Sequence, residues 1–155
     1  MRAVGVLFVG LLLALSPAAA VGAKPLPAEN IVIDTAKGPR AFRVEVAADD
    51  ASRERGLMQR AHLAANGGML FDFRKQVMTA FWMKDTPLSL DILFVRADGT
   101  ISTIAANAVP FSTAEIVSAE PIRAVIEING GLARKLGIVP GDRVRASIFA
   151  DANTH

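Results

Sequence analysis

The sequence predicts an α+β fold, a small and mainly antiparallel barrel-like domain of seven or eight strands with two short helices. Several segments alternate apolar and polar residues at the period of a half-buried strand, as Phe42, Val44 and Val46 do with the residues between them. Only two stretches have helical character, and both are short. This is too much strand for a parallel sheet wound with alternating helices.

The first half of the domain is expected to hold one helix and several strands. Asp49 and Asp50 can cap a helix N-terminus, so a short helix begins there. Asn66-Gly67-Gly68 is a turn signal, which separates this helix from the next strand. The strands of this half are expected at residues 31–33, 42–46, 69–73 and 77–83.

The second half alternates strands with clear turn signals. Asp98-Gly99 indicates a tight hairpin, and residues 107–121 are expected to form a long irregular excursion. Gly130-Gly131 opens a short helix over 132–136, which Gly137 can end in a left-handed conformation. The strands of this half are expected at residues 90–95, 101–104, 122–128 and 142–149.

The N-terminal residues are typical of a secretory signal peptide. Arg2 precedes an apolar run over residues 4–15, and Ala-rich segments follow. The run is shorter than the ~20 residues that span a bilayer, so we expect contact with a membrane only during export. Because the chain has no Cys, export indicates a bacterial periplasm or the exterior. The expected division is a signal peptide at 1–23, a leader at 24–30, a single domain at 31–150 and a tail at 151–155.

Composition argues against several classes of function. The chain has 17 Lys and Arg against 15 Asp and Glu, and loss of Arg2 with the signal peptide leaves 16 against 15. A near-neutral exported domain is a poor nucleic-acid binder, so we expect no nucleic-acid partner. The absence of Cys removes thiol catalysis and thiolate metal sites, and His62 has no second histidine near it in the sequence. We expect no cofactor, no metal and a monomer.

Several motifs follow one another at short spacings and together resemble the DUF192 family. They are Gly56-Leu57-Met58-Gln59-Arg60, Gly68-Met69-Leu70-Phe71-Asp72-Phe73, the stretch from Phe81 to Asp91, Gly99-Thr100-Ile101 and the segment 137–144. The resemblance extends from about Phe42 to Ile148. It implies a small, often exported domain of uncharacterised function. Asp85 departs from the family pattern, which commonly has Asn at this position.

The stretch from Phe81 to Asp91 is the first candidate for a functional surface. It places Lys, Asp and Thr consecutively beside the only Trp of the chain, between two apolar strands. The Lys would offer a cation, the Thr a hydroxyl and the carboxylates would orient them, while aromatic rings would form a stacking wall. Two arginines near the Gly56-Leu57-Met58 motif could hold a carboxylate or phosphate at the mouth. The candidate ligand-binding residues are Phe71, Trp82, Lys84, Asp85, Thr86 and Asp91, with Arg55 and Arg60.

Other interpretations of these residues stay open. The polar cluster could be a self-satisfied turn, in which its side chains cap backbone groups. A glycoside hydrolase would need two carboxylates at a suitable separation, drawn from Asp72, Asp85 and Asp91. Copper binding would need several thioethers to converge at the surface. The methionines available for such a site are Met58, Met69, Met78 and Met83.

We therefore expect an exported binding or accessory module of the cell envelope that recognises a small or polymeric ligand, with no reaction and no catalytic residue assigned. The first alternative is a carboxylate-dependent hydrolase acting on an envelope polymer. The second is a structural protein-interaction domain without a pocket. A cavity holding polar groups would favour a ligand site, and a flat apolar patch around Trp82 would favour a protein partner.

Overall fold

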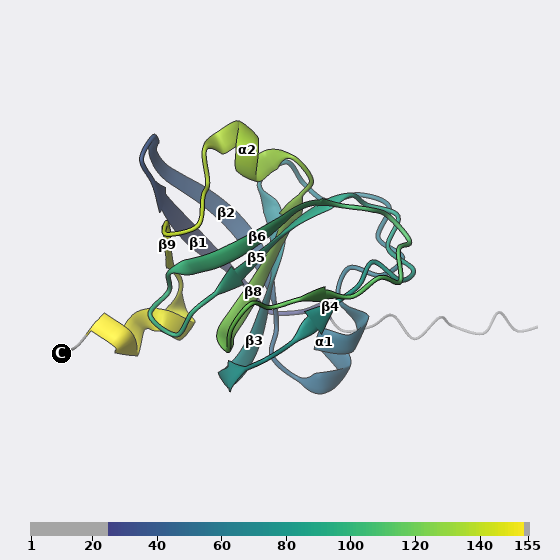
Figure 1. Cartoon of the computed structure of the whole chain (residues 1–155), viewed down its shortest axis with the longest axis horizontal. Coiled ribbons are helices and arrows are strands. Elements are labelled where there is room, and N and C mark those ends of the chain that lie inside the picture. Colours follow the sequence, from purple (N-terminus) through teal and green to yellow (C-terminus); the bar gives the residue numbers. More distant parts are fainter. Residues whose placement is uncertain (1–24, 154–155) are drawn as a thin grey trace, which may run out of the picture.

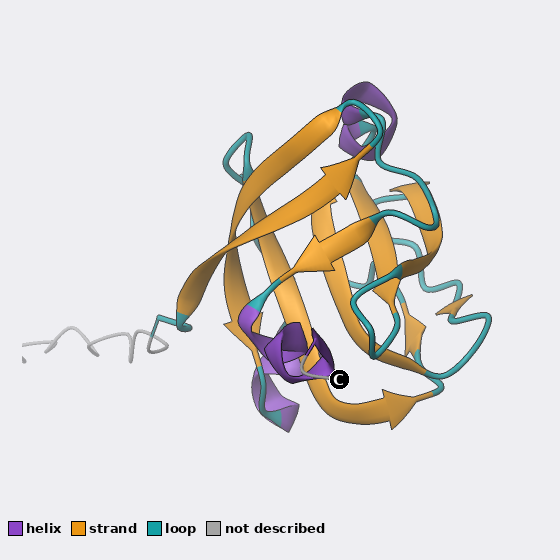
Figure 2. Ribbon diagram, turned by 90° about the vertical axis from the view of Figure 1, so that its left-hand side faces the viewer, coloured by secondary structure: helices purple, strands orange, loops and turns teal. Residues whose placement is uncertain are grey.

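The computed structural model of the chain describes residues 25–153, so the predicted signal peptide at 1–23 and the last two residues lie outside the described part. The fold is mainly strand, and a curled, mostly antiparallel sheet of seven strands forms a half-barrel with two short helices (Figures 1 and 2). The α+β, barrel-like class that the sequence predicts is confirmed.

The sheet has the strand order β6-β5-β8-β3-β2-β1-β9. Its only parallel pair in the described chain is β2 with β3, and the other neighbours are antiparallel. The strands of the sheet are β1 (Ala28–Thr35), β2 (Gly38–Ala47), β3 (Gly67–Val77), β5 (Leu90–Val95), β6 (Ile101–Ala108), β8 (Ile122–Asn129) and β9 (Arg143–Arg145). A separate two-stranded sheet pairs β4 (Ala80–Phe81) with β7 (Ile116–Val117).

The two edges of the curled sheet meet at one end. Thr100, just before β6, forms an antiparallel bridge with Arg143 of β9. Backbone hydrogen bonds extend this contact, because the Ile101 amide donates to the Asp142 carbonyl at 2.9 Å and the Val144 amide donates to the Gly99 carbonyl at 2.8 Å. The edge groups that an open sheet would expose are therefore partly satisfied here.

Two apolar cores lie on the two faces of the sheet. Side chains alternate between the faces, so neighbouring residues of β8 serve different cores: Ala124 and Ile126 one, Val125 the other. The inner core fills the half-barrel and includes Ile31, Ile33, Phe42, Leu70, Leu93, Ile126 and Phe149. The outer core lies between the sheet, the β2–β3 crossover and the segment around β4, and it includes Leu57, Met69, Phe71, Met83, Ile92 and Phe94.

Both helices are short and begin where the sequence predicts, and α1 ends at Arg55, before the Gly56-Leu57-Met58 motif. Helix α1 (Asp50–Arg55) has Asp49 as its N-cap, and Asp49 and Ser52 form a reciprocal capping box. Helix α2 (Leu132–Leu136) ends at Gly137, whose φ of 75° lies in the left-handed region. None of the helices in residues 25–153 has the length and apolar character needed to span a bilayer.

Several strand boundaries differ from the expected ones: β2 begins at Gly38, β3 spans Gly67–Val77 and β6 continues to Ala108. The strand expected at 77–83 is reduced to the two residues of β4, because β3 continues to Val77 and then bends away from the sheet. The strand expected at 142–149 stops at Arg145, and the 3₁₀ helix η1 (Ser147–Asn153) then brings Phe149 into the inner core. Strand β1 begins at Ala28, three residues before the apolar run.

Candidate functional site

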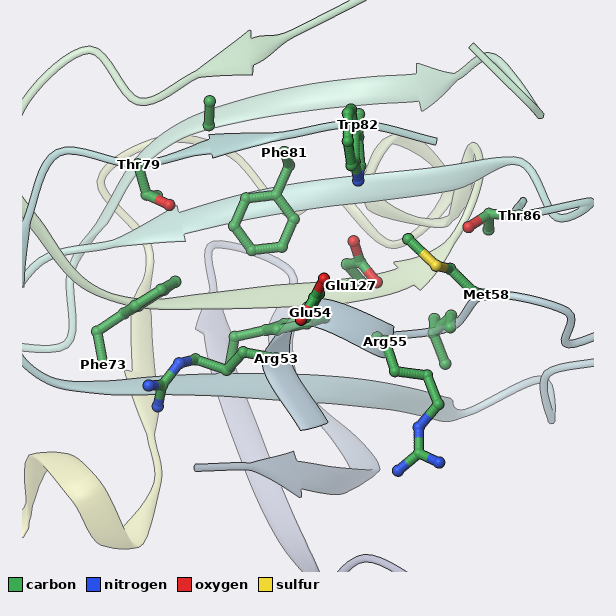
Figure 3. A pocket seen from close by; sticks show the side chains of 14 residues that line it. Arg53, Glu54, Arg55, Met58, Phe73, Thr79, Phe81, Trp82, Thr86 and Glu127 are labelled. Atoms are coloured by element: carbon green, nitrogen blue, oxygen red, sulfur yellow. The ribbon is translucent and has the colours of Figure 1, made fainter. Parts of the chain in front are cut away.

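A cavity of about 310 Å³ lies on the outer face of the sheet, between α1, the end of β3, β4 and β8 (Figure 3). Its walls are largely aromatic and apolar, and a few polar side chains reach into it or stand at its rim. This composition is typical of small-molecule sites. The cavity is lined by Arg53, Glu54, Arg55, Gly56, Leu57, Met58, Phe71, Phe73, Thr79, Ala80, Phe81, Trp82, Thr86 and Glu127.

A bulge in β3 shapes the aromatic wall. The pairing of β3 with β8 shifts between Asp72 and Val77, and Arg74 adopts a φ of 61° within this bulge. The Asp72 carboxylate stabilises the bend, because it accepts a hydrogen bond from the Arg74 amide at 2.7 Å and forms an ion pair with Arg123. The bent chain then crosses back over the outer face, which places Phe81 of β4 above the sheet.

Phe81 is the centre of the aromatic wall. Its ring makes edge-on contacts with Phe71 at a centroid distance of 5.0 Å, with Phe73 at 6.5 Å and with Phe94 at 6.2 Å. Edge-to-face pairs of this kind stabilise one another by about 0.5–1.5 kcal/mol each beyond their burial. The wall is therefore a preformed surface.

Glu127 lies at the floor of the cavity. It sits on the central strand β8, where its register partners are Met69 of β3 and Ile92 of β5, and it is only 4% exposed. Among the residues that the structure describes, no donor forms a hydrogen bond or ion pair with its carboxyl group. Burial raises the pKa of Glu127 to about 8, so the carboxyl is mostly protonated at neutral pH.

Charged side chains from α1 stand at the rim. Arg53 is engaged there, since it pairs with Asp50, donates to the Asp72 carbonyl at 2.8 Å and lies 5.6 Å from the centroid of the Phe73 ring. Glu54 and Arg55 are exposed, and neither has an ion pair within residues 25–153. In Figure 3 the guanidinium groups of Arg53 and Arg55 extend away from Glu127.

Four of the sequence-predicted site residues line this cavity: Phe71, Trp82, Thr86 and Arg55. Trp82 is 47% exposed and forms part of the wall. Thr86 is buried, and its hydroxyl donates to the Lys84 carbonyl at 3.0 Å. The structure thus brings together the aromatic part of the candidate site and one of its hydroxyls.

Lys84 and Asp85 lie outside the cavity lining. The Lys84 ammonium stacks on Trp82, with Nζ 5.4 Å from the ring centroid. Asp85 is exposed in a left-handed conformation with a φ of 53°, and its carbonyl accepts a hydrogen bond from the Gln59 amide at 2.7 Å. Asp and Asn tolerate this conformation better than most residues, so Asp85 shapes the turn between Met83 and Thr86.

Asp91 has a structural role that does not involve the Lys84-Asp85-Thr86 turn. It is completely buried, and its carboxylate accepts three backbone hydrogen bonds, from Asn107 at 2.8 Å, Gly131 at 2.9 Å and Ala133 at 2.8 Å. These contacts tie the start of α2 and the end of β6 to β5. The carboxylate that sequence reasoning placed in the recognition site therefore holds the two ends of other elements.

Arg60 forms an ion pair with Glu45, on another side of the crossover. It makes a bidentate contact with Glu45 of β2 at 2.7 and 2.5 Å, and this hydrogen bonding raises the pKa of the guanidinium. Arg60 lines two other hollows next to β2, while Arg55 is shared between one of these and the aromatic cavity.

The three carboxylates considered for hydrolysis do not converge. Asp72 pairs in register with Ala124 and Asp91 with Ile128, which separates their backbones by about 13 Å along β8. This exceeds the ~9.5 Å upper limit for a pair of glycosidase carboxylates, and Asp85 lies in an exposed turn.

The methionines are also dispersed. Met69 and Met83 belong to the outer core, Met78 is exposed, and Met58 lines the cavity. Within the described part of the chain, no group of three or more His, Cys, Asp or Glu side chains is arranged to hold a metal ion.

Glu127 is the site residue that sequence reasoning missed. An acidic residue stands in the middle of the apolar run from Ala124 to Ile128, and this was the available signal. On an antiparallel strand such a residue usually marks the solvated face. Here the crossover and β4 cover that face, which turns Glu127 into the floor of a cavity.

Comparison with known proteins places this fold in a family. The family model DUF192, described as "Uncharacterized ACR", matches residues 31–146. A crystal structure from Sinorhizobium meliloti 1021, provisionally described as that of a transcription regulator, is 44% identical with a TM-score of 0.79, covering 82% of this chain and 99% of that one. A protein of unknown function from Novosphingobium aromaticivorans DSM 12444 is 41% identical with a TM-score of 0.78, covering 86% of this chain and 94% of that one. No protein of curated function matches significantly. The chain belongs to the DUF192 family.

Proposed function

We propose that this chain is an exported binding protein of the bacterial envelope, and that its cavity beside α1 takes a small ligand with an apolar body. The observation that carries the proposal is the combination of an aromatic wall with one buried, unpartnered acid at the floor. The Glu127 carboxyl faces the cavity and has no hydrogen-bond partner among the described residues, and groups that contribute little to folding are often kept for binding.

The cavity favours a ligand site over a purely structural interaction domain. Its volume of about 310 Å³ is near the lower limit of ordinary small-molecule pockets, which suits a compact ligand or one unit of a larger molecule. The export half of the proposal is supported by the charged start, short apolar run and Ala-rich segment of residues 1–23.

A nucleic-acid function, which the description of the Sinorhizobium protein would suggest, is not favoured by the charge of this chain. The expected mature chain has 16 basic and 15 acidic residues. Several of the arginines are already neutralised by carboxylates, among them Arg60, Arg96, Arg123 and Arg145. Few cations are left to follow a phosphate backbone.

Trp82 is an intrinsic reporter for the proposed site. It is the only Trp, the chain has no Tyr, and the indole lies in the cavity wall. Small aromatic amines, acids and neutral compounds would be titrated while the Trp82 emission and the melting temperature are recorded. A matched variant is Thr79→Phe. Thr79 is a half-buried lining residue two positions before Phe81, so its side chain lies on the cavity side of the chain (Figure 3), and a larger side chain there would fill the space.

Binding in the cavity predicts that some compounds shift the emission and raise the melting temperature of the wild type but not of Thr79→Phe. The proposal would be overturned if every compound acted equally on both proteins, because such a response could not come from the cavity.

A further inference from the structure

The Glu127 carboxyl is a buried polar group in the cavity that lacks a hydrogen-bond partner. It is more than nine-tenths buried, it lines the cavity, and no donor in the described part of the chain contacts it. Its neighbours across the sheet, Met69 and Ile92, are completely buried and apolar, so their side chains cannot donate a hydrogen bond to the carboxyl group. A partner for this carboxyl has to come from the contents of the cavity.

No charged side chain from the surrounding elements neutralises Glu127. On β8 the cation of the same face, Arg123, is paired with Asp72. On α1 the guanidinium of Arg53 is paired with Asp50, and that of the exposed Arg55 extends away from Glu127 (Figure 3).

The remaining charged groups also leave Glu127 without a counter-charge. In the turn after β4, the ammonium of Lys84 stacks on Trp82. The only other acid in the lining is Glu54, at the exposed rim. Burial is the sole cause that raises the pKa of Glu127.

The walls of the cavity suit a cation. Phe71, Phe73, Phe81 and Trp82 line it, and the faces of aromatic rings attract positive charge. No described residue donates a hydrogen bond to the Glu127 oxygens. A primary ammonium would supply three N–H donors to them, whereas a quaternary ammonium has none. Building on the proposed function, we infer that the ligand carries a primary ammonium group, which binds the Glu127 carboxylate at the floor while the apolar body packs against the aromatic wall.

Binding of such a ligand is coupled to the release of a proton from Glu127. The carboxylic acid of Glu127 loses its proton to solvent, and the resulting carboxylate pairs with the incoming ammonium, so one proton is released for each ligand bound. Because the pKa of Glu127 is about 8 without ligand, the affinity for an amine should rise about tenfold from pH 6 to pH 7 and about fivefold from pH 7 to pH 8. Above pH 8 it should level off, since an alkyl ammonium stays charged to about pH 10.

The test compares three probes of similar shape: phenethylamine, 3-phenylpropionate and phenethyl alcohol. Each is titrated at pH 6, 7 and 8 with Trp82 emission as the readout, using the wild type, Glu127→Gln and the control Glu115→Gln, an exposed acid outside the cavity lining. We expect the amine to bind tightest, to gain about tenfold from pH 6 to pH 7 and about fivefold from pH 7 to pH 8, and to lose at least about tenfold at pH 8 in Glu127→Gln together with its pH dependence. Glu115→Gln should change the affinity less than about threefold.

Proton release provides a measurement that needs no variant. Calorimetric titration of the wild type with phenethylamine, in two buffers of different ionisation enthalpy at pH 7, should give a release close to one proton per ligand. Zero release, or no binding of the amine, overturns the inference.

The failures of the two proposals are distinguishable. If the alcohol or the acid binds more tightly than the amine, with an affinity that falls toward pH 8, Glu127 acts as a neutral hydrogen-bond donor. The ammonium inference is then wrong, and the cavity remains a binding site. The proposed function itself fails only if the wild type and Thr79→Phe respond alike.

Discussion

The carboxylate of Asp91 accepts a hydrogen bond from the backbone amide of Ala133 at 2.8 Å, and this contact fixes the first turn of α2 to strand β5. The same carboxylate also accepts from Gly131 and Asn107. Helix α2 has no side-chain cap of its own, so an acid 42 residues earlier in the chain satisfies donors that a local cap would otherwise satisfy.

Asp91→Asn should destabilise the fold by about 2–4 kcal/mol, because the amide would point an N–H at a backbone donor and would lose the charge-assisted bonds. Urea unfolding measures the change. Asp85→Asn is the matched control: it makes the same chemical change in an exposed left-handed turn, and we expect an effect within about 0.5 kcal/mol. Equal effects of the two variants would contradict the anchoring role of Asp91.

Glu127→Gln should become more stable relative to the wild type as the pH rises. The unfolded Glu ionises near pH 4.5 and the folded one near pH 8, so the folded protein binds more protons in this window and wild-type stability falls across it. The difference between the two proteins should grow by up to about 5 kcal/mol between these pH values. Unfolding free energies at pH 5, 6, 7 and 8 test this, and a pH-independent difference would exclude a buried acid of this kind.

Trp82→Ala should cost only about 1 kcal/mol, although tryptophan is the largest side chain of the protein. The indole is 47% exposed, so its removal leaves no closed cavity. Met83→Ala, at the next position, should cost about 2–5 kcal/mol, because Met83 is 1% exposed in the outer core. Denaturant titration of both variants measures the contrast. A loss above about 3 kcal/mol for Trp82→Ala would show that the ring carries part of the core.

The protein recovered from the bacterial periplasm should begin near Lys24. The short apolar run of residues 4–15 and the small residues after it supply both parts of a cleavable signal. Intact-mass measurement of the periplasmic protein identifies the start. An intact Met1 in the membrane fraction would contradict export with cleavage.

Local chemistry in the sequence was sufficient for several elements. The buried strand at Leu90–Val95 and the short helix ended by Gly137 lie where their apolar run and left-handed glycine indicate. These features depend on near neighbours in the chain. The DUF192 motifs identify the family, because several ordered motifs occur together.

The site could be predicted only in part, because it depends on long-range pairing. The sequence does not show that β8 inserts between β3 and β5, nor that the chain after the β3 bulge folds back over the outer face. For this reason sequence patterns place Asp91 among the candidate ligand-binding residues and leave Glu127 out. The acid beside the polar turn is saturated by backbone amides, whereas the acid inside an apolar strand has no partner in the described chain.

The parallel pairing of β2 with β3 has a consequence for how this family can diversify. A parallel pair forces the chain to cross the sheet, and here the crossover of residues 48–66 carries α1 and one side of the cavity. The inner core does not depend on that segment, because its side chains come from the opposite face. On the proposed function, homologous chains could exchange one ligand preference for another by changing about twenty contiguous residues, while the inner core keeps its packing.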